Sequence, residues 1–319
     1  LIRTRGTRLA EALVPGSYVA VIEAPEGVTV RDPVQIGRGE SLTRRITLPQ
    51  PGAIPAGFVY IAAGRFLYGT DRDEGTRQWL EAQPLHTVET GAYLIARTEV
   101  TLGAWMDYLR ALPDDERARR TPQPKGDAPL LTLAAGRFTL SIKPTQTVYR
   151  VAEGEPLVYP GRTIRREVRW ERMPVAGISW DDAVAYLRWL DQTGRVPGAR
   201  LCTLHEWERA ARGADGRTYP HGELLRPSDA NVDETYGREQ AAFGLDEVGS
   251  FPISDSPFGL SDTSGNVWEW LRGPGGKPNS KGGSWYQHKN SAVLANRKAS
   301  EPTEHDLRIG LRACASVAR

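Results

Sequence analysis

Residues 259–270 read Gly-Leu-Ser-Asp-Thr-Ser-Gly-Asn-Val-Trp-Glu-Trp, and this stretch says more about the fold than any other part of the chain. Side chains along an extended segment alternate between two faces, so Trp268 and Trp270 lie on one face and Glu269 on the other. Indole rings are large apolar groups that proteins bury. We therefore expect the two tryptophans in the core and the carboxylate of Glu269 directed toward a polar partner.

That partner has two candidates. Asp262 lies seven residues before Glu269, and the backbone carbonyls of Gly265 and Val267 lie between the two acids. Carboxylate and carbonyl oxygens together are the ligands that a hard cation prefers. Alternatively, Glu269 accepts backbone N–H groups or pairs with an arginine, as buried carboxylates generally do. The stretch itself leaves both alternatives open.

Composition excludes several classes of protein. The 319 residues include 41 Lys plus Arg and 39 Asp plus Glu, a net charge of +2, and 39% of residues are hydrophobic. This balance predicts neither nucleic-acid binding nor electrostatic binding to a membrane surface. No apolar stretch approaches the roughly 20 residues that span a bilayer, so we expect no membrane insertion by this segment. The chain reads as one large globular domain with a smaller one.

The smaller domain is expected at residues 1–52. Apolar and polar residues alternate at period two in 17–23 and 43–48, which predicts a small all-β sandwich. A proline-containing linker at 50–56 follows, and residues 53–319 form the second domain.

Helix-capping signals divide the second domain. A helix is expected at about 101–111, a second after Ser179 with Gly194 as its end, and a third after Thr203, where Glu206 completes a capping box. An inserted β segment is expected at about 121–172, because strand-like runs occur between the first two helices.

Several motifs, taken in order, resemble the formylglycine-generating enzyme (sulfatase-modifying factor) family. They are 84–86 with 99–101, 174–183, 200–208 with 210–213, 259–270, 282–285, 296–297 and 310–312. The resemblance runs from about Phe58 to Arg312. It implies an α+β fold, the family's variant of the C-type lectin fold, preceded here by the small sandwich. The whole arrangement also resembles the C-terminal region of bacterial serine/threonine protein kinases. The kinase resemblance implies a bacterial origin, and the low count of two cysteines leads us to expect a cytoplasmic location.

The resemblance implies one structural calcium ion. Its ligands would be the acids and carbonyls noted above: Asp262, Gly265, Val267 and Glu269. A second family calcium site would use Asn231 and the carbonyl of Val232. Its later ligand positions align near Gln240 and Ala242, which supply no carboxylate, so we do not expect that site to survive.

The catalytic pattern of the family is absent from the sequence. Family enzymes oxidise a substrate cysteine through copper(I) held by two cysteine thiolates, ligands that suit a soft ion. The matching positions hold Gln287 and Ala292. We therefore expect no copper and no oxidase activity. The two cysteines present, Cys202 and Cys314, are expected to be inert buried thiols, with a contact or disulfide between them as the alternative.

The surface near the lost copper site is expected to bind a ligand. Its composition is typical of adaptable recognition surfaces, although ordinary solvated loops with Trp285 in the core are the alternative. The candidate ligand-binding residues are Trp285, Tyr286, Gln287, His288, Lys298, Glu301, His305, Asp306 and Arg308.

The sequence thus predicts a non-catalytic module that binds a protein or peptide ligand, or senses one, as part of a bacterial signalling kinase. Three alternatives stay open. One is an altered oxidase of the same family. Another is a variable binding protein diversified by a retroelement, because the motifs 282–285 and 310–312 bracket the variable region of such proteins. The third is a domain that only spaces or oligomerises a larger chain.

Overall fold

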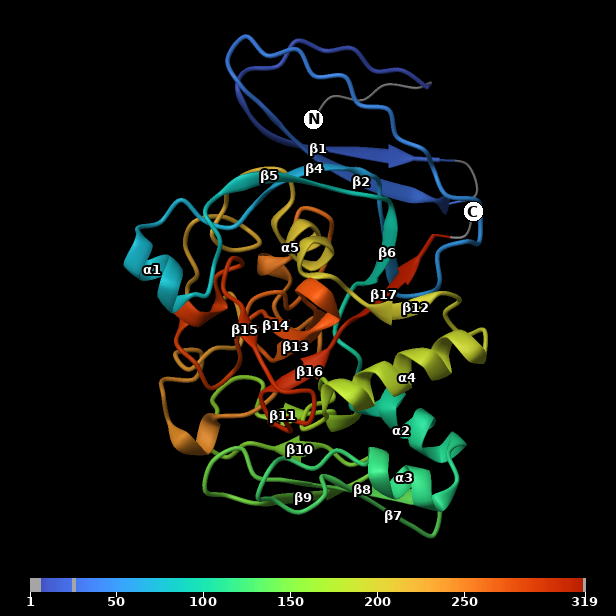
Figure 1. Ribbon diagram of the computed structural model, residues 1–319. Coiled ribbons are helices and arrows are strands. Elements are labelled where there is room, and N and C mark those ends of the chain that lie inside the picture. The colour runs from blue at the N-terminus through green and yellow to red at the C-terminus, as the bar shows by residue number, and fades with distance from the viewer. Residues whose placement is uncertain (1–6, 25–26, 318–319) are drawn as a thin grey trace.

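Two four-stranded sheets form the centre of the molecule in the computed structural model, which describes residues 7–24 and 27–317 (Figure 1). The first sheet is antiparallel, with strands β12 (Ala199–Leu201), β17 (Ala313–Ser316), β6 (Tyr93–Ala96) and β3 (Phe58–Ile61) in that order. The second contains β15 (Lys298–Ala299), β14 (Pro278–Lys281), β13 (Trp268–Arg272) and β16 (Ile309–Leu311), and its β13 and β16 are parallel. A separate pair joins β4 (Gly64–Tyr68) to β5 (His86–Thr90).

The stretch quoted first builds the central strand β13. Trp268 and Trp270 pack in the main core, and the indole N–H of Trp270 donates to the carbonyl of Ile178 at 3.0 Å. Glu269 is fully buried and directed to the opposite side of the strand, where Trp207 donates to it. The period-two prediction for these three residues is confirmed.

The three predicted helices begin at the predicted caps. They are α2 (Leu102–Ala111), α4 (Trp180–Gln192) and α5 (Leu204–Arg212). The Thr101 side chain caps α2, and both Ser179 with Asp182 and Thr203 with Glu206 form reciprocal capping boxes. Two short helices were not predicted: α1 (Glu74–Trp79) and α3 (Asp114–Arg120), neither of which has a buried residue.

The predicted β insert forms two small sheets. Strands β7 (Leu131–Ala134), β8 (Arg137–Ile142) and β9 (Tyr149–Ala152) make one antiparallel sheet, and β10 (Leu157–Val158) pairs with β11 (Glu167–Val168). In Figure 1 these strands lie at the end of the molecule opposite β1 and β2.

The N-terminal segment differs from the expected sandwich. Its described residues form one antiparallel ribbon of β1 (Gly16–Glu23) and β2 (Thr29–Ile36), and 43–48 is irregular instead of a strand. Val28 and Val30 pack in the main core, and Arg31 donates to the carbonyl of Pro257 at 2.7 Å. A two-stranded ribbon cannot bury its own apolar face, so it uses the large domain as its second layer. Residues 1–6, 25 and 26 of the predicted domain lie outside the described residues.

The cysteines correct a second expectation. Cys202, between β12 and α5, and Cys314, in β17, form a disulfide with an S–S distance of 2.10 Å, and both are fully buried. Strand pairing explains this bond, because Cys314 lies opposite Arg200 in the register of β12 and β17. Cys202 directly follows β12, and its Cα lies 5.0 Å from that of Cys314, which is close enough for a disulfide.

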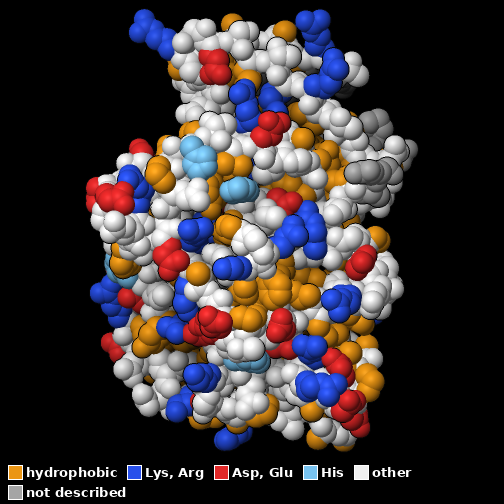
Figure 2. Space-filling view, viewed as in Figure 1, with side chains coloured by type: hydrophobic (Ala, Val, Ile, Leu, Met, Phe, Trp, Pro, Cys, Tyr) orange, Lys and Arg blue, Asp and Glu red, His pale blue; other side chains and the backbone are white. Residues whose placement is uncertain are grey.

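The charges of the surface are mixed. On the face seen in Figure 2, basic and acidic side chains are interspersed over the whole molecule. Within residues 7–24 and 27–317, no helix is both long enough and apolar enough to cross a bilayer.

Candidate ligand-binding cavity

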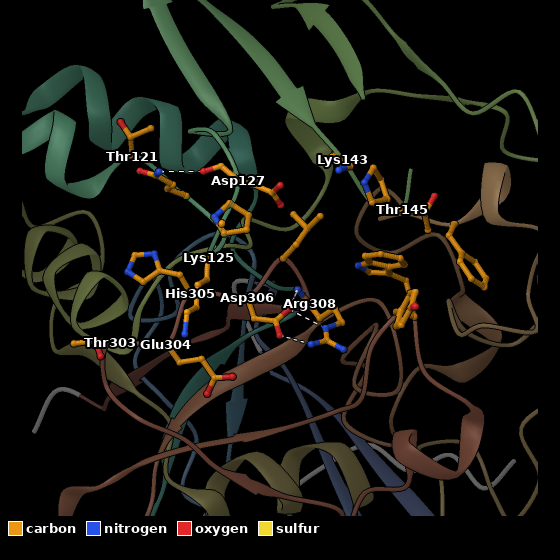
Figure 3. Close-up of a pocket in the computed structure, with 18 of the residues that line it drawn as sticks. Thr121, Lys125, Asp127, Lys143, Thr145, Thr303, Glu304, His305, Asp306 and Arg308 are labelled. Carbon is orange, nitrogen blue, oxygen red and sulfur yellow. Dashed lines mark hydrogen bonds and ion pairs between the residues drawn. The ribbon is translucent and has the colours of Figure 1, made fainter. Parts of the chain in front are cut away.

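A cavity of about 1280 Å³ lies between the C-terminal loops and the β insert. Its walls come from 118–127, from the β8–β9 connection at 143–146, from 285–286 and from 301–308. In Figure 3, residues of the insert and residues of the C-terminal loop face each other across this space. Six of the nine predicted ligand residues line it: Trp285, Tyr286, Glu301, His305, Asp306 and Arg308.

One wall is aromatic. Phe243 contacts Tyr286 edge to face, with ring centroids 5.7 Å apart, and Trp285 meets Tyr286 in the same way at 5.4 Å. Trp285 is only 2% exposed, as the core alternative predicted, whereas Tyr286 is 47% exposed. The tyrosine ring is therefore the aromatic surface that a ligand can contact, and the other two rings support it.

A partly exposed ion pair stiffens the loop that faces the insert. Arg308 donates to Asp306 from its backbone N–H and from its guanidinium, with Nε at 2.8 Å from Oδ1. The guanidinium also lies 5.7 Å from the ring centroid of Tyr286. Burial alone would raise the pKa of Asp306, but the hydrogen bonds from Arg308 hold that pKa below its ordinary value. Asp306 is thus a fixed anion, and it orients Arg308 beside the tyrosine.

His305 is fixed by the start of α4. Its Nδ1 lies 3.2 Å from the carbonyl of Gly177, and its Nε2 lies 3.7 Å from Oδ2 of Asp182, the residue that completes the α4 capping box. The contact of Nδ1 therefore holds the imidazole at the edge of the cavity.

The insert supplies residues that the sequence reasoning did not include in the site. Lys125, Lys143, Thr145 and Gln146 all line the cavity. Thr145 Oγ1 also donates to the carbonyl of Gln240 at 2.9 Å, so the insert is attached to the loop that carries the aromatic wall. The sequence indicated the insert itself but held no signal for which face of the domain it returns to.

Three predicted ligand residues do not line the cavity. The side-chain oxygen of Gln287 accepts hydrogen bonds from Trp268 and from Ser284. The Nε2 of His288 lies 3.2 Å from Glu234, and Lys298 pairs with Glu304 at 2.8 Å. These three side chains form contacts with neighbouring residues of the protein instead of facing the cavity.

The positions that match the family's copper ligands hold side chains that do not suit copper(I). Gln287 is engaged as just described, and Ala292 is 1% exposed in an apolar cluster with Leu80 and Val293. The sulfurs of the chain's two cysteines are bonded to each other. A soft ion held by a thiolate pair has no ligands at this place.

Two of the four positions expected to hold calcium, Asp262 and Glu269, have hydrogen-bond donors of the protein as partners. Arg312 donates to both oxygens of Glu269, with Nη2 at 2.7 Å from Oε1 and Nε at 2.9 Å from Oε2, and Trp207 donates to Oε2 at 2.6 Å. Asp262 accepts from the backbone N–H of Gly249 at 2.5 Å. Within the described part of the chain, no group of three or more His, Cys, Asp or Glu side chains is placed to hold a metal ion. Glu269 thus pairs with an arginine, the second alternative of the sequence analysis.

Two buried carboxylic acids, Asp262 and Glu99, interact with each other close to Glu269. Burial raises the pKa of Asp262 to about 6 and raises that of Glu99 well above its ordinary value, and each affects the other. Asn266 donates to Glu99 Oε1 at 3.1 Å. With Glu269 included, this region holds three buried acids and one buried arginine, so a proton on the Asp262–Glu99 pair lowers the cost of burial.

Comparison with a solved structure defines the class of fold. The Treponema denticola variable protein 1 superposes with a TM-score of 0.55 at 17% sequence identity, covering 95% of this chain and 100% of that protein. Both have the C-type lectin-like fold.

The family follows from the sequence. Residues 46–317 match the model of the sulfatase-modifying factor enzyme 1-like domain, and the chain belongs to that family. The inactive C-alpha-formylglycine-generating enzyme 2 of Mus musculus is 32% identical over 176 residues, which cover 50% of this chain and 54% of that protein. The serine/threonine-protein kinase pkn1 of Chlamydia pneumoniae is 26% identical over 316 residues, 92% of this chain and 43% of the kinase. The chain thus spans about half the length of these curated relatives.

Proposed function

We propose that this chain is a non-catalytic module that binds an extended peptide segment of a partner protein in the cavity between the insert and the C-terminal loops. The observation that carries the proposal is the contrast between two places. At the positions of the family's thiolates, Gln287 is tied to Trp268 and Ala292 is buried. A few residues away, a large cavity with an exposed tyrosine is open.

The lining favours a peptide over a small apolar molecule. An exposed ring at Tyr286 accepts an apolar side chain, and Gln146 and Thr145 offer amide and hydroxyl groups near the main chain of a ligand. Lys125 and Lys143 supply cations from the insert, and Glu301 supplies a carboxylate from the opposite wall. A peptide with an acidic, a basic and an apolar side chain would contact all of these groups at once.

Selection from a displayed random-peptide library, followed by titration of the best peptide, tests the proposal. Tyr286→Ala should weaken binding at least about tenfold, because the ring is the exposed aromatic anchor. Trp79→Ala is the matched control, since Trp79 is 61% exposed and does not line the cavity. Equal affinities for wild type, Tyr286→Ala and Trp79→Ala would reject this cavity as the binding site.

The oxidase alternative has its own test. The purified protein is supplied with copper(I), oxygen and a cysteine peptide, and aldehyde formation is followed by mass spectrometry. We expect no aldehyde, because the two thiolate positions hold Gln287 and Ala292. The mouse relative that carries the word inactive in its name supports the same expectation. Aldehyde product would replace the binding proposal with catalysis.

Two further features of the proposal concern context. Similarity to a bacterial kinase over 92% of this chain supports a sensory role beside a kinase and a bacterial origin. A cytoplasmic location is part of the proposal, although the Cys202–Cys314 disulfide is more typical of an oxidising compartment.

The fold shared with a variable protein supports the alternative of a binding protein diversified by a retroelement. Sibling sequences that differ only between residues 285 and 309 would favour that alternative.

A further inference from the structure

A single arginine of the insert occupies the middle of the loop at 231–246. Arg162 is 3% exposed, and its guanidinium is surrounded by oxygen atoms of that loop. Its Nε donates to the carbonyl of Ala242 at 2.7 Å and its Nη2 to the carbonyl of Gly244 at 2.9 Å. Its Nη1 donates to Oδ1 of Asp246 at 2.6 Å. Two carbonyls and one carboxylate are the kinds of ligand that a hard cation takes.

Aromatic rings close the two faces of this guanidinium. The carbon Cζ of Arg162 lies 3.9 Å from the ring centroid of Tyr159 and 4.0 Å from that of Tyr236. The hydroxyl of Tyr236 donates to the other oxygen of Asp246 at 2.7 Å. A planar cation between two rings, with its edges hydrogen-bonded, is held in one position.

The loop at 231–246 is also where one of the family's calcium sites was expected to be lost. Asn231 begins the loop, but its amide nitrogen donates to the carbonyl of Gly244 at 3.0 Å and approaches Asn266 Oδ1 at 3.2 Å. The loop oxygens of Ala242, Gly244 and Asp246 all face Arg162. The positive charge at the centre of this loop is therefore that of the Arg162 side chain and not that of a bound ion.

We propose that Arg162 is a built-in cation that takes the place of a bound calcium ion in shaping the loop at 231–246, so that the insert and not a metal fixes one wall of the cavity. Gln240 and Phe243 of this loop line the cavity. Two further contacts from the insert reinforce the attachment, because Thr145 donates to the carbonyl of Gln240 and Tyr149 to that of Ala241 at 3.4 Å. The proposal does not depend on what the cavity binds.

Removal of the guanidinium should release the loop. Without it, Asp246 would be a buried carboxylate with no cationic partner, the carbonyl of Ala242 would lose its donor, and the carbonyl of Gly244 would keep only the donor from Asn231. A lysine would restore the charge but not the planar fork that reaches three oxygens at once.

Hydrogen exchange of the full chain, read at the amides of 236–246, tests this proposal with and without calcium chloride. We expect calcium to leave the exchange of this segment unchanged in wild type. In Arg162→Ala, exchange there should be at least about tenfold faster, and in Arg162→Lys it should be intermediate. Calcium should slow the exchange of Arg162→Ala, because the vacated oxygens are then free to bind it.

Arg165→Ala is the matched control. Arg165 belongs to the same connection, lies 4.2 Å from the ring centroid of Phe251 and donates to the carbonyl of Ser250, so it holds a different segment. This variant should leave exchange at 236–246 as in wild type. Protection of 236–246 by calcium in wild type, or unchanged exchange in Arg162→Ala, would overturn the proposal. If Arg162→Ala does not fold, Arg162→Lys with wild-type exchange would do the same.

Discussion

The buried pair of Glu269 and Arg312 makes a residue-scale prediction about stability. Glu269→Gln should lower the free energy of unfolding by about 3–5 kcal/mol, because it leaves the Arg312 guanidinium buried without its anion. Urea denaturation at equilibrium measures the change. Glu304→Gln is the control, since the Glu304–Lys298 pair is 28% and 43% exposed and should contribute less than about 1 kcal/mol.

The same measurement in calcium addresses the metal expectation. Calcium should not stabilise the wild-type protein, because both carboxylate oxygens of Glu269 already accept hydrogen bonds from Arg312. A calcium-dependent increase in the free energy of unfolding that disappears in Glu269→Gln would instead support the site expected at Asp262, Gly265, Val267 and Glu269.

Asp262 makes a prediction about pH. Burial raises its pKa from 3.8 to about 6, so the folded state holds the proton more tightly than the unfolded chain does. The contribution of this group to stability is therefore complete below about pH 4 and is lost as the pH rises to about 6, a difference of about 3 kcal/mol. Asp262→Asn should remove this part of the pH dependence. Asparagine tolerates the φ of 59° at this position and can still accept from Gly249.

Denaturation curves of wild type and Asp262→Asn between pH 4 and pH 7 check this prediction. The variant should gain stability relative to wild type as the pH rises. A constant difference over this range would mean that Asp262 is not the titrating group.

At the scale of single residues, the sequence predicted the face to which a side chain points better than it predicted the residue that the side chain contacts. Strict alternation in 268–270 was enough to place two indoles inward and a carboxylate on the other face. Arg312 lies 43 residues away from Glu269, and no local pattern shows that parallel pairing of β13 and β16 brings them together. The choice between a metal and an arginine depended on that pairing.

At the scale of secondary-structure elements, the disulfide joins the β12–α5 connection to β17. The two cysteines are 112 residues apart, and closing so long a loop restricts the unfolded chain. Reduction should therefore lower the free energy of unfolding by about 2–5 kcal/mol. Urea denaturation with and without reductant measures it.

The double variant Cys202→Ala/Cys314→Ala provides the comparison for that experiment. It should match reduced wild type closely and should not respond to reductant. Equal stability of oxidised and reduced wild type would show that the bond does not stabilise the fold.

Helices were predictable because their signals are local. Ser179 with Asp182 and Thr203 with Glu206 lie within one turn of each other, and the structure begins α4 and α5 there. The insert was predictable as β structure for the same reason. Its role in the cavity was not, because Lys143 and Arg308 are brought to one space only by the packing of the whole domain.

At the scale of the whole molecule, the N-terminal ribbon is structurally part of the large domain. Val28 and Val30 pack in the same core as Trp270, and the guanidinium of Arg44 donates to the carbonyl of Ala63 in the large domain at 3.1 Å. A chain of residues 53–319 should therefore be less stable than the full chain by at least about 3 kcal/mol, since two buried valines and their partners lose contact.

Thermal and urea unfolding of the two chains make this comparison. Equal stability would mean that residues 1–52 are an independent domain, as the sequence suggested. The alternation in 17–23 correctly predicted a strand, but it could not show which layer would cover it, because apolar faces of a ribbon and of a sandwich have the same period.

The connection between β8 and β9 has a practical consequence. It reaches the cavity through 143–146, while β8 and β9 are paired through 139–142 and 149–152. A loop anchored in this way can change length and chemistry without disturbing the central sheets. Grafting foreign sequences at this connection would convert the domain into a scaffold for engineered recognition, much as antibody frameworks carry exchangeable loops.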